Sequence, residues 1–151
     1  MISHNFCLRP VHSADIELLL ELMKHFYRDE ELPFDKGGAR KAVEELMTTP
    51  AFGTIFLLLA DEEVIGYLVA IQSFILEFGG RQTFLDELFI VEKWRGRGFG
   101  RQALTAVEVY ARESGCCALR LEASRKNARA LAMYERAGFE KHDRFTMTKV
   151  L

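Results

Sequence analysis

Apolar residues recur every three or four positions in four stretches of the chain, which is the spacing of a helix that packs one face against a core. The first stretch begins after Ser13, whose hydroxyl suits a helix N-cap. The second is stopped by Pro50, and the last is followed by Gly138, at the usual position beyond a helix C-terminus. A polar, acidic segment at 28–38 is expected to be a loop. The expected helices cover residues 13–26, 39–49, 98–113 and 127–137.

Runs rich in apolar and β-branched residues separate these helices and predict strands. Asp61-Glu62-Glu63 and Gly79-Gly80 read as turns, so the strands around them form antiparallel hairpins. Elsewhere helices and strands alternate. The order therefore predicts an α/β (α+β) fold, with a mixed, mostly antiparallel twisted sheet, helices on both faces and a single domain over 1–151. The expected strands are 6–9, 54–60, 64–76, 83–91, 118–123 and a final strand region at 139–149.

The composition argues against several classes of function. The net charge of −2 over 151 residues gives no support to nucleic-acid binding. No apolar run approaches the ~18 residues of a membrane span, and residues 1–10 lack the pattern of a secretory signal. The three cysteines show no Cys-x-x-Cys spacing, which argues against a disulfide framework or a metal site. We therefore expect a cytoplasmic protein that uses no metal.

A glycine-rich turn between the strand at 83–91 and the helix at 98–113 is the most informative segment. Its three glycines allow a tight turn and close approach of a ligand, and the free amides at the helix start form an anion site. The P-loop pattern is absent, and the dinucleotide pattern lacks its third glycine because Arg101 occupies that position. From the turn alone, a Gly/Arg-rich surface turn stays an equal alternative. The cations nearby are Lys93, Arg95, Arg97 and Arg101.

Two motifs together resemble the GNAT superfamily of acetyl-CoA-dependent N-acyltransferases. The first is Arg-x-x-Gly-x-Gly, read from Arg95, and the second is Asn-x-x-Ala-x-x-x-Tyr-x-x-x-Gly-Phe, read from Asn127. The resemblance implies acetyl-CoA as co-substrate, with its pyrophosphate on the turn and its pantetheine arm along the strand that ends at Val91. The residues it implies for acetyl-CoA are Leu88, Phe89, Ile90, Arg95, Gly96, Arg97, Gly98, Phe99, Gly100, Arg101, Asn127, Ala130 and Tyr134.

Acetyl transfer to an amine requires a base for the amine and an acid for the departing thiolate. The motif position of Tyr134 implies the acid, although its helix face also fits a core aromatic. Asp86 and Glu87 lie in an apolar strand, where alternation places them on opposite faces and where a carboxylate needs a partner or a task. One of them is the expected base, and a structural salt bridge to Arg9 or Arg120 is the alternative.

The stretch 85–91 looks like the branch with the spermidine/spermine and thialysine N-acetyltransferases, which favours Asp86 as the base. An acidic segment that follows aromatic residues would suit a cationic amine, and a solvated loop is the alternative. We therefore expect a small cationic acceptor. A protein lysine or N-terminus, or a non-catalytic acetyl-CoA sensor, remains an alternative, and the resemblance also implies a homodimer. The expected acceptor residues are Tyr27, Glu30, Glu31 and Glu77.

Overall fold

The computed structural model describes residues 4–151, so the first three residues of the segment in which we expect no secretory signal lie outside it. None of the helices in this described part is long and apolar enough to cross a membrane. The strands are β1 (Phe6–Pro10), β2 (Gly53–Ala60), β3 (Glu63–Ile75), β4 (Gly80–Ile90) and β5 (Ala118–Leu121). The α-helices are α1 (Ile16–Asp29), α2 (Lys36–Thr48), α3 (Phe99–Glu113) and α4 (Ala128–Arg136), with 3-10 turns η1 (Ser13–Asp15) and η2 (Glu92–Trp94).

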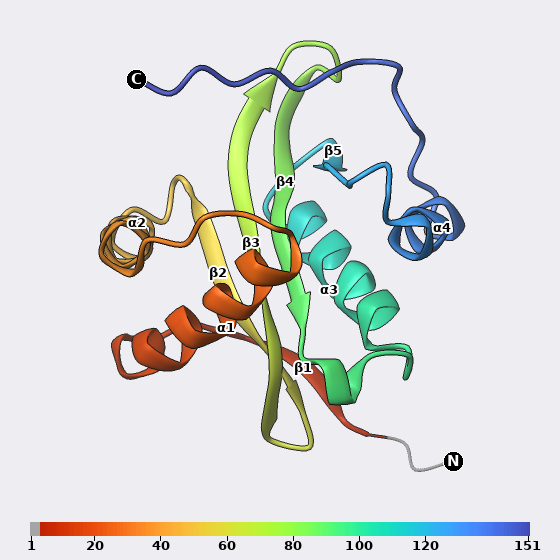
Figure 1. Ribbon diagram of the computed structural model, residues 1–151. Coiled ribbons are helices and arrows are strands. Elements are labelled where there is room, and N and C mark those ends of the chain that lie inside the picture. The colour runs from red at the N-terminus through yellow and green to blue at the C-terminus, as the bar shows by residue number, and fades with distance from the viewer. Residues whose placement is uncertain (1–3) are drawn as a thin grey trace.

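The strands form one sheet in the order β1-β2-β3-β4-β5. The first three pairings are antiparallel, and β4 pairs with β5 in parallel. Helices α1 and α2 cover one face of this sheet, and α3 and α4 cover the other (Figure 1). The expected mixed, mostly antiparallel sheet with helices on both faces is therefore confirmed.

Two apolar cores lie on the two faces of the sheet. Adjacent side chains of β2 point into different cores: Leu57 belongs to the core under α1 and α2, and Leu58 belongs to the core under α3. Both side chains are fully buried. A strand covered on both faces needs apolar residues at successive positions, which explains the continuous apolar run in this part of the sequence.

The acidic loop is shorter than the sequence predicts. Helix α1 continues to Asp29, and α2 already begins at Lys36. The side chain of Asp35 accepts hydrogen bonds from the amides of Gly37 and Gly38, at 3.2 and 3.0 Å. This N-cap satisfies amides that are otherwise free at a helix start, so the two glycines join the helix instead of the loop.

The final strand expected at 139–149 is wrong, because residues 139–151 form neither helix nor strand. We call residues 140–151 the C-terminal tail, and all of them are exposed. Figure 1 shows the tail leaving α4 and crossing the tip of the β3–β4 hairpin. The alternating pattern of the tail predicts a strand, but a strand forms only where a neighbour supplies hydrogen bonds, and no strand of residues 4–151 pairs with it.

Candidate active site

Strands β4 and β5 part halfway along β4. Their pairing runs from Gln82 opposite Ala118 to Leu85 opposite Leu121, where β5 ends. Strand β4 continues to Ile90 with β3 as its one neighbour among the described strands. This separation leaves backbone groups of β4 facing an opening in which an extended ligand can find hydrogen-bond partners.

A β-bulge lies at the same point of β4. Glu87 is opposite Val69 and Leu85 is opposite Ala70, so Asp86 is an extra residue without a partner in the register. Because of this insertion, Leu85 and Leu88 pack in the same core although three positions separate them. The simple alternation used to place the two carboxylates is therefore interrupted, since a bulge bends the strand and redirects its side chains.

Glu87 is held by two tyrosines. The Tyr27 hydroxyl donates to one carboxylate oxygen and the Tyr67 hydroxyl donates to the other, each at 2.7 Å. Burial raises the pKa of Glu87, and these two hydrogen bonds oppose that rise because they stabilise the charged form. Tyr67 is fully buried in the sheet, and Tyr27 comes from the last turn of α1. Glu87 therefore links α1 to β3 and β4.

Asp86 is in a more open position. Its side chain is exposed, yet its pKa is raised because the surrounding protein removes part of its hydration and because the Glu122 carboxylate lies nearby. The alternative of a salt bridge is not supported within residues 4–151. Arg9 instead binds Asp15 through two hydrogen bonds of 2.8 and 2.9 Å, and Arg120 lies over the Phe78 ring.

Tyr134 lies on α4 against the core formed with α3. Its ring packs against Phe139 with centroids 5.9 Å apart, so the aromatic packing expected as an alternative is present. Its pKa is raised first by burial and second by the negative charge of Glu30. This places the carboxylate of Glu30, just after α1, within electrostatic range of the phenol, and the raised pKa keeps the phenol protonated.

The glycine-rich turn adopts the geometry of an anion site. Gly96 and Gly98 have φ of +76° and +87°, a left-handed conformation that favours glycine. The first bond of α3 runs from the Gln102 amide to the Gly98 carbonyl oxygen at 3.2 Å. The amides of the residues between them have no partner within the helix, and the helix dipole adds positive potential at the same end.

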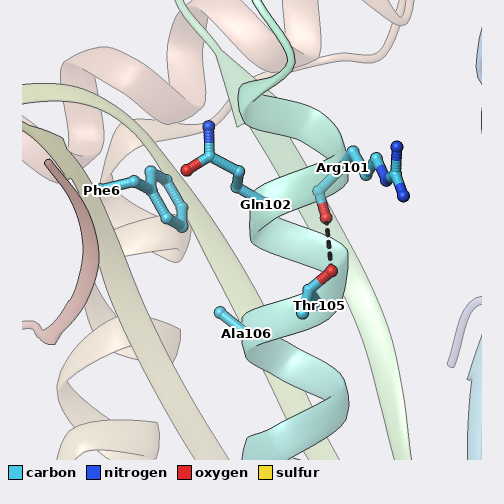
Figure 2. A pocket seen from close by; sticks show the side chains of 5 residues that line it. All are labelled: Phe6, Arg101, Gln102, Thr105 and Ala106. Carbon is cyan, nitrogen blue, oxygen red and sulfur yellow. Dashed lines mark hydrogen bonds between the residues drawn. The ribbon is translucent and has the colours of Figure 1, made fainter. Parts of the chain in front are cut away.

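The arginines of the turn are used in different ways. Arg95 donates to the Ile90 carbonyl oxygen at 2.7 Å and forms an ion pair with Asp29 at 2.8 Å, so its side chain is engaged with the protein. Arg97 stacks over the Trp94 ring at 4.9 Å. The side chain of Arg101 points away from Phe6, beside a hollow of about 460 Å³ that is lined by Phe6 of β1 and by residues of α3 (Figure 2).

Sequence reasoning missed Arg129, in the first turn of α4. A Cβ atom added to Gly96 would lie 3.2 Å from a guanidinium nitrogen of Arg129, so this exposed cation reaches the glycine-rich turn. Arg129 forms no salt bridge within residues 4–151. The signal in the sequence was its place two residues after Asn127, which caps the same helix by accepting from the Ala130 amide at 3.1 Å.

Not all the expected site residues come together. Glu77 lies at the tip of the β3–β4 hairpin, where it binds Arg144 at 3.2 Å, and this tip is at the opposite end of β4 from the glycine-rich turn (Figure 1). Glu31 is exposed next to Glu30. Within residues 4–151, no three His, Cys, Asp or Glu side chains gather as metal ligands would.

Comparison with known proteins identifies similar sequences and folds. The model of the acetyltransferase (GNAT) family matches residues 19–139. An aminoglycoside N(6')-acetyltransferase type 1 from Stenotrophomonas maltophilia is 30% identical over 148 residues, which cover 95% of this chain and 92% of that protein. A thialysine N-epsilon-acetyltransferase from Bos taurus is 31% identical over 75 residues, covering 50% of this chain and 44% of that protein.

Similar solved structures include complexes with CoA or with a CoA-containing bisubstrate analogue. The aminoglycoside N-acetyltransferase AAC(6')-Iy in complex with CoA has a TM-score of 0.82, with 99% of this chain and 97% of that chain covered. Its sequence is 19% identical, so this likeness shows a shared fold.

The position of Arg129 generates a prediction for anion binding. We expect Arg129→Ala to raise the dissociation constant of CoA about five- to tenfold at low salt, because one charge-assisted contact at a partly exposed site is lost. Isothermal titration calorimetry at two salt concentrations measures this change, and the loss should shrink as salt screens the charge. Arg136→Ala, in the last turn of the same helix, is the matched control. Equal affinities for the two variants would contradict a role of Arg129 in binding.

Proposed function

This chain belongs to the acetyltransferase (GNAT) family, and we propose that it transfers the acetyl group of acetyl-CoA to a primary amine of a small, multiply charged cation. Membership of the family supports an acetyl-CoA-dependent enzyme. The small, multiply charged amine as acceptor is our proposal beyond family membership. The three free cysteines support a reducing cytoplasm as its location, and we also propose that the protein works as a homodimer.

The residues present fit acetyl-CoA. The free amides at the start of α3, with Arg97, Arg101 and Arg129 nearby, would hold the pyrophosphate and other phosphates. The unpaired side of β4 from Leu88 to Ile90 would hydrogen-bond the pantetheine arm in the manner of an added strand. Ala130 follows Arg129 in the first turn of α4, and its amide donates to the Asn127 side chain.

One observation carries the proposal for the acceptor. The Glu30 carboxylate lies within electrostatic range of Tyr134, and the Glu122 carboxylate lies within that range of Asp86, at the point where β4 and β5 part. Within residues 4–151 no ion pair joins Glu30, Asp86 or Glu122 to a cation. Unpaired like charges repel one another, so a bound polycation would relieve this repulsion and gain affinity.

The reaction needs a neutral amine, whereas a free alkylamine has a pKa near ~10. We propose that Asp86, directly or through a water molecule, accepts the amine proton as the nitrogen attacks the thioester carbonyl carbon. Backbone amides of the unpaired part of β4 would stabilise the oxygen that becomes negative. As the carbon–sulfur bond breaks, Tyr134 would donate its proton to the thiolate of CoA.

Asp86 is preferred to Glu87 as the base because of what each carboxylate already binds. Both oxygens of Glu87 accept hydrogen bonds from phenols, which occupies them and fixes the side chain toward α1. Asp86 is exposed at the bulge and has no hydrogen-bond partner within residues 4–151, so it is free to meet an amine. A raised pKa also makes a carboxylate a better proton acceptor.

The relatives support an amine acceptor without fixing its identity. One is named for aminoglycosides and the other for thialysine, and both of these acceptors are cationic amines. The polyamine-like acceptor that the stretch 85–91 implies carries the same chemistry, several amines on a small flexible molecule. We therefore propose the shared property, multiple positive charge, as what the site recognises.

The proposed acid gives a first test. We expect Tyr134→Phe to lower kcat about 10²-fold, the usual scale for loss of a general acid, while the affinity for acetyl-CoA changes less than twofold. The ring is retained, so packing against Phe139 should persist. Steady-state kinetics and calorimetric CoA binding measure the two quantities. A normal turnover number would leave Tyr134 as a core aromatic alone.

The pH profile tests the base. A raised pKa means that Asp86 becomes an acceptor only above that pKa, so kcat/KM should rise with pH through it. In Asp86→Asn the amine must lose its proton to water, so the rising limb should move to higher pH and kcat should fall about 10²-fold. Glu87→Gln is the comparison: it should lower the unfolding temperature, since an amide nitrogen cannot accept from a phenol, and leave the rising limb in place. The reverse result would assign the base to Glu87.

A panel of acceptors tests the proposed substrate class. We expect CoA release with spermidine and with an aminoglycoside, and much less with a lysine peptide or a monoamine. Glu30→Gln should raise KM for spermidine about tenfold at low salt with little change in kcat, because Glu30 binds a remote charge. Glu62→Gln, in the β2–β3 turn, is the charge-matched control. Acetylation of the peptide alone would overturn the small-cation acceptor and favour a protein substrate.

A further inference from the structure

The guanidinium of Arg95 is held by three contacts within the protein. Its Nε donates to the Ile90 carbonyl oxygen at 2.7 Å, at the end of β4, and a terminal nitrogen forms an ion pair with Asp29 at 2.8 Å. The guanidinium also lies over the Phe89 ring, 5.4 Å from its centroid. Hydrogen bonds in two directions and a ring under one face leave a planar cation few orientations, so this side chain is fixed in place.

Asp29 ends α1 and meets Arg95 across 66 positions of the chain. Its pKa is lowered because Arg95, and to a lesser degree Arg28, donate hydrogen bonds to the charged form. The side chains of Asp29 and Arg95 are 32% and 42% exposed, so both keep part of their contact with water. Both are charged at neutral pH, and the ion pair joins the end of α1 to the glycine-rich turn.

The end of α1 is firmly joined to the acidic residues that follow it. The Glu31 amide donates to the Arg28 carbonyl oxygen at 3.1 Å. The Leu32 amide donates to the Tyr27 carbonyl oxygen at 2.8 Å. Glu31 has φ of +56°, the left-handed conformation typical of a helix end with these two bonds. Glu30 lies within this hydrogen-bonded turn, so its position depends on where the last turn of α1 is held.

Two contacts hold that last turn against the sheet and the glycine-rich turn. Tyr27 donates to Glu87 at 2.7 Å, and Asp29 binds Arg95. Side chains two positions apart point to different sides of a helix, so these contacts restrain the turn from two directions. With the bond to Glu87 alone, the end of α1 could rotate about its own axis. The contact with Arg95 removes this freedom.

The charge of Arg95 is poorly placed for a phosphate. Asp29 neutralises it, and a phosphate that approached Arg95 would also approach this carboxylate. By contrast, Arg101 and Arg129 form no ion pair within residues 4–151. The first amides of α3 also lack partners within the helix. The anion site therefore has donors of its own without Arg95.

We propose that Arg95 and Asp29 form a positioning pair, which fixes the last turn of α1 and so holds the Glu30 carboxylate where the acceptor amine binds. Arg95 then serves the acceptor side of the reaction, in place of the acetyl-CoA contact that the family resemblance implies for it. This role rests on the proposed function, because Glu30 is there the residue that binds the amine. The use of Arg95 to hold α1 does not depend on which amine is acetylated.

CoA binding and hydrogen exchange separate the two roles of Arg95 without any acceptor. We expect Arg95→Gln and Asp29→Asn each to leave the dissociation constant of CoA within twofold, as calorimetry would measure. Each should speed amide exchange at residues 27–32 about fivefold, because the end of α1 loses one of its two restraints. Arg28→Gln is the matched control, since Arg28 contacts Asp29 from within the same helix turn, and it should change neither quantity.

A phosphate ligand would give a different pattern. Arg95→Gln would then weaken CoA binding at least tenfold, and Asp29→Asn would tighten it by releasing the arginine from its carboxylate. That result would overturn the positioning role, and so would unchanged exchange at residues 27–32 in both variants. Should Arg95→Gln fail to fold, as circular dichroism would show, Asp29→Asn decides, because the two roles predict different CoA affinities for it.

Steady-state kinetics test the link to the acceptor. At saturating acetyl-CoA, Arg95→Gln and Asp29→Asn should each raise KM for spermidine about fivefold, and the double variant should be no worse than the poorer single one, because either change breaks the same contact. In a Glu30→Gln background, Arg95→Gln should add less than twofold, since the carboxylate that it positions is already lost. Effects that add in full would mean that the residues act separately, which would overturn the pair.

The role of the pair and the proposed function can fail separately. If no amine is acetylated, the proposed function fails together with the acceptor part of this role, and CoA affinity and exchange still decide whether Arg95 holds α1. If spermidine is acetylated and its KM is unchanged in both variants, the proposed function stands and the pair does not position the acceptor side.

Discussion

Strands β4 and β5 run parallel for four residue pairs and then separate after Leu85 and Leu121. The inserted Asp86 bends β4 at this point, so the strand continues toward the glycine-rich turn without β5 beside it. The backbone groups of β4 that lose this neighbour need another molecule or water to bind them. An extended ligand could bind to these backbone groups, and the side chains around the opening would then contact that ligand.

Both positive and negative charge lie around the opening. At one end, the first amides of α3 and the guanidinium of Arg129 create positive potential suited to phosphates. Negative charge lies elsewhere around it, from Glu30 near Tyr134 and from Glu122 near Asp86, and under the proposed function this charge would attract an amine cation. Donor and acceptor of opposite charge would thus be drawn to different parts of one opening and meet near Tyr134.

The position of α1 controls this arrangement. Its last turn is joined to the sheet by Tyr27 and Glu87 and to the glycine-rich turn by Asp29 and Arg95. These contacts connect the acceptor side with the phosphate side through one helix end, and Glu30 follows directly. The part-buried bonds to Glu87 should weaken less with salt than the exposed ion pair of Asp29 and Arg95, because they are less accessible to water and ions. Arg95 therefore contributes to the site through the protein, by holding α1 in place.

The sequence by itself determined the local elements and their faces, since helix and strand periods depend on neighbouring residues. It predicted the glycine-rich turn and the helix that carries Tyr134, and the resemblance implied the role of each. Tertiary structure alone decided the bulge at Asp86, the approach of Arg129 to Gly96 and of Glu30 to Tyr134, because these pairs are far apart in the chain and meet only through packing. It also left the alternating tail without a strand, because a strand needs a partner that no local pattern can supply.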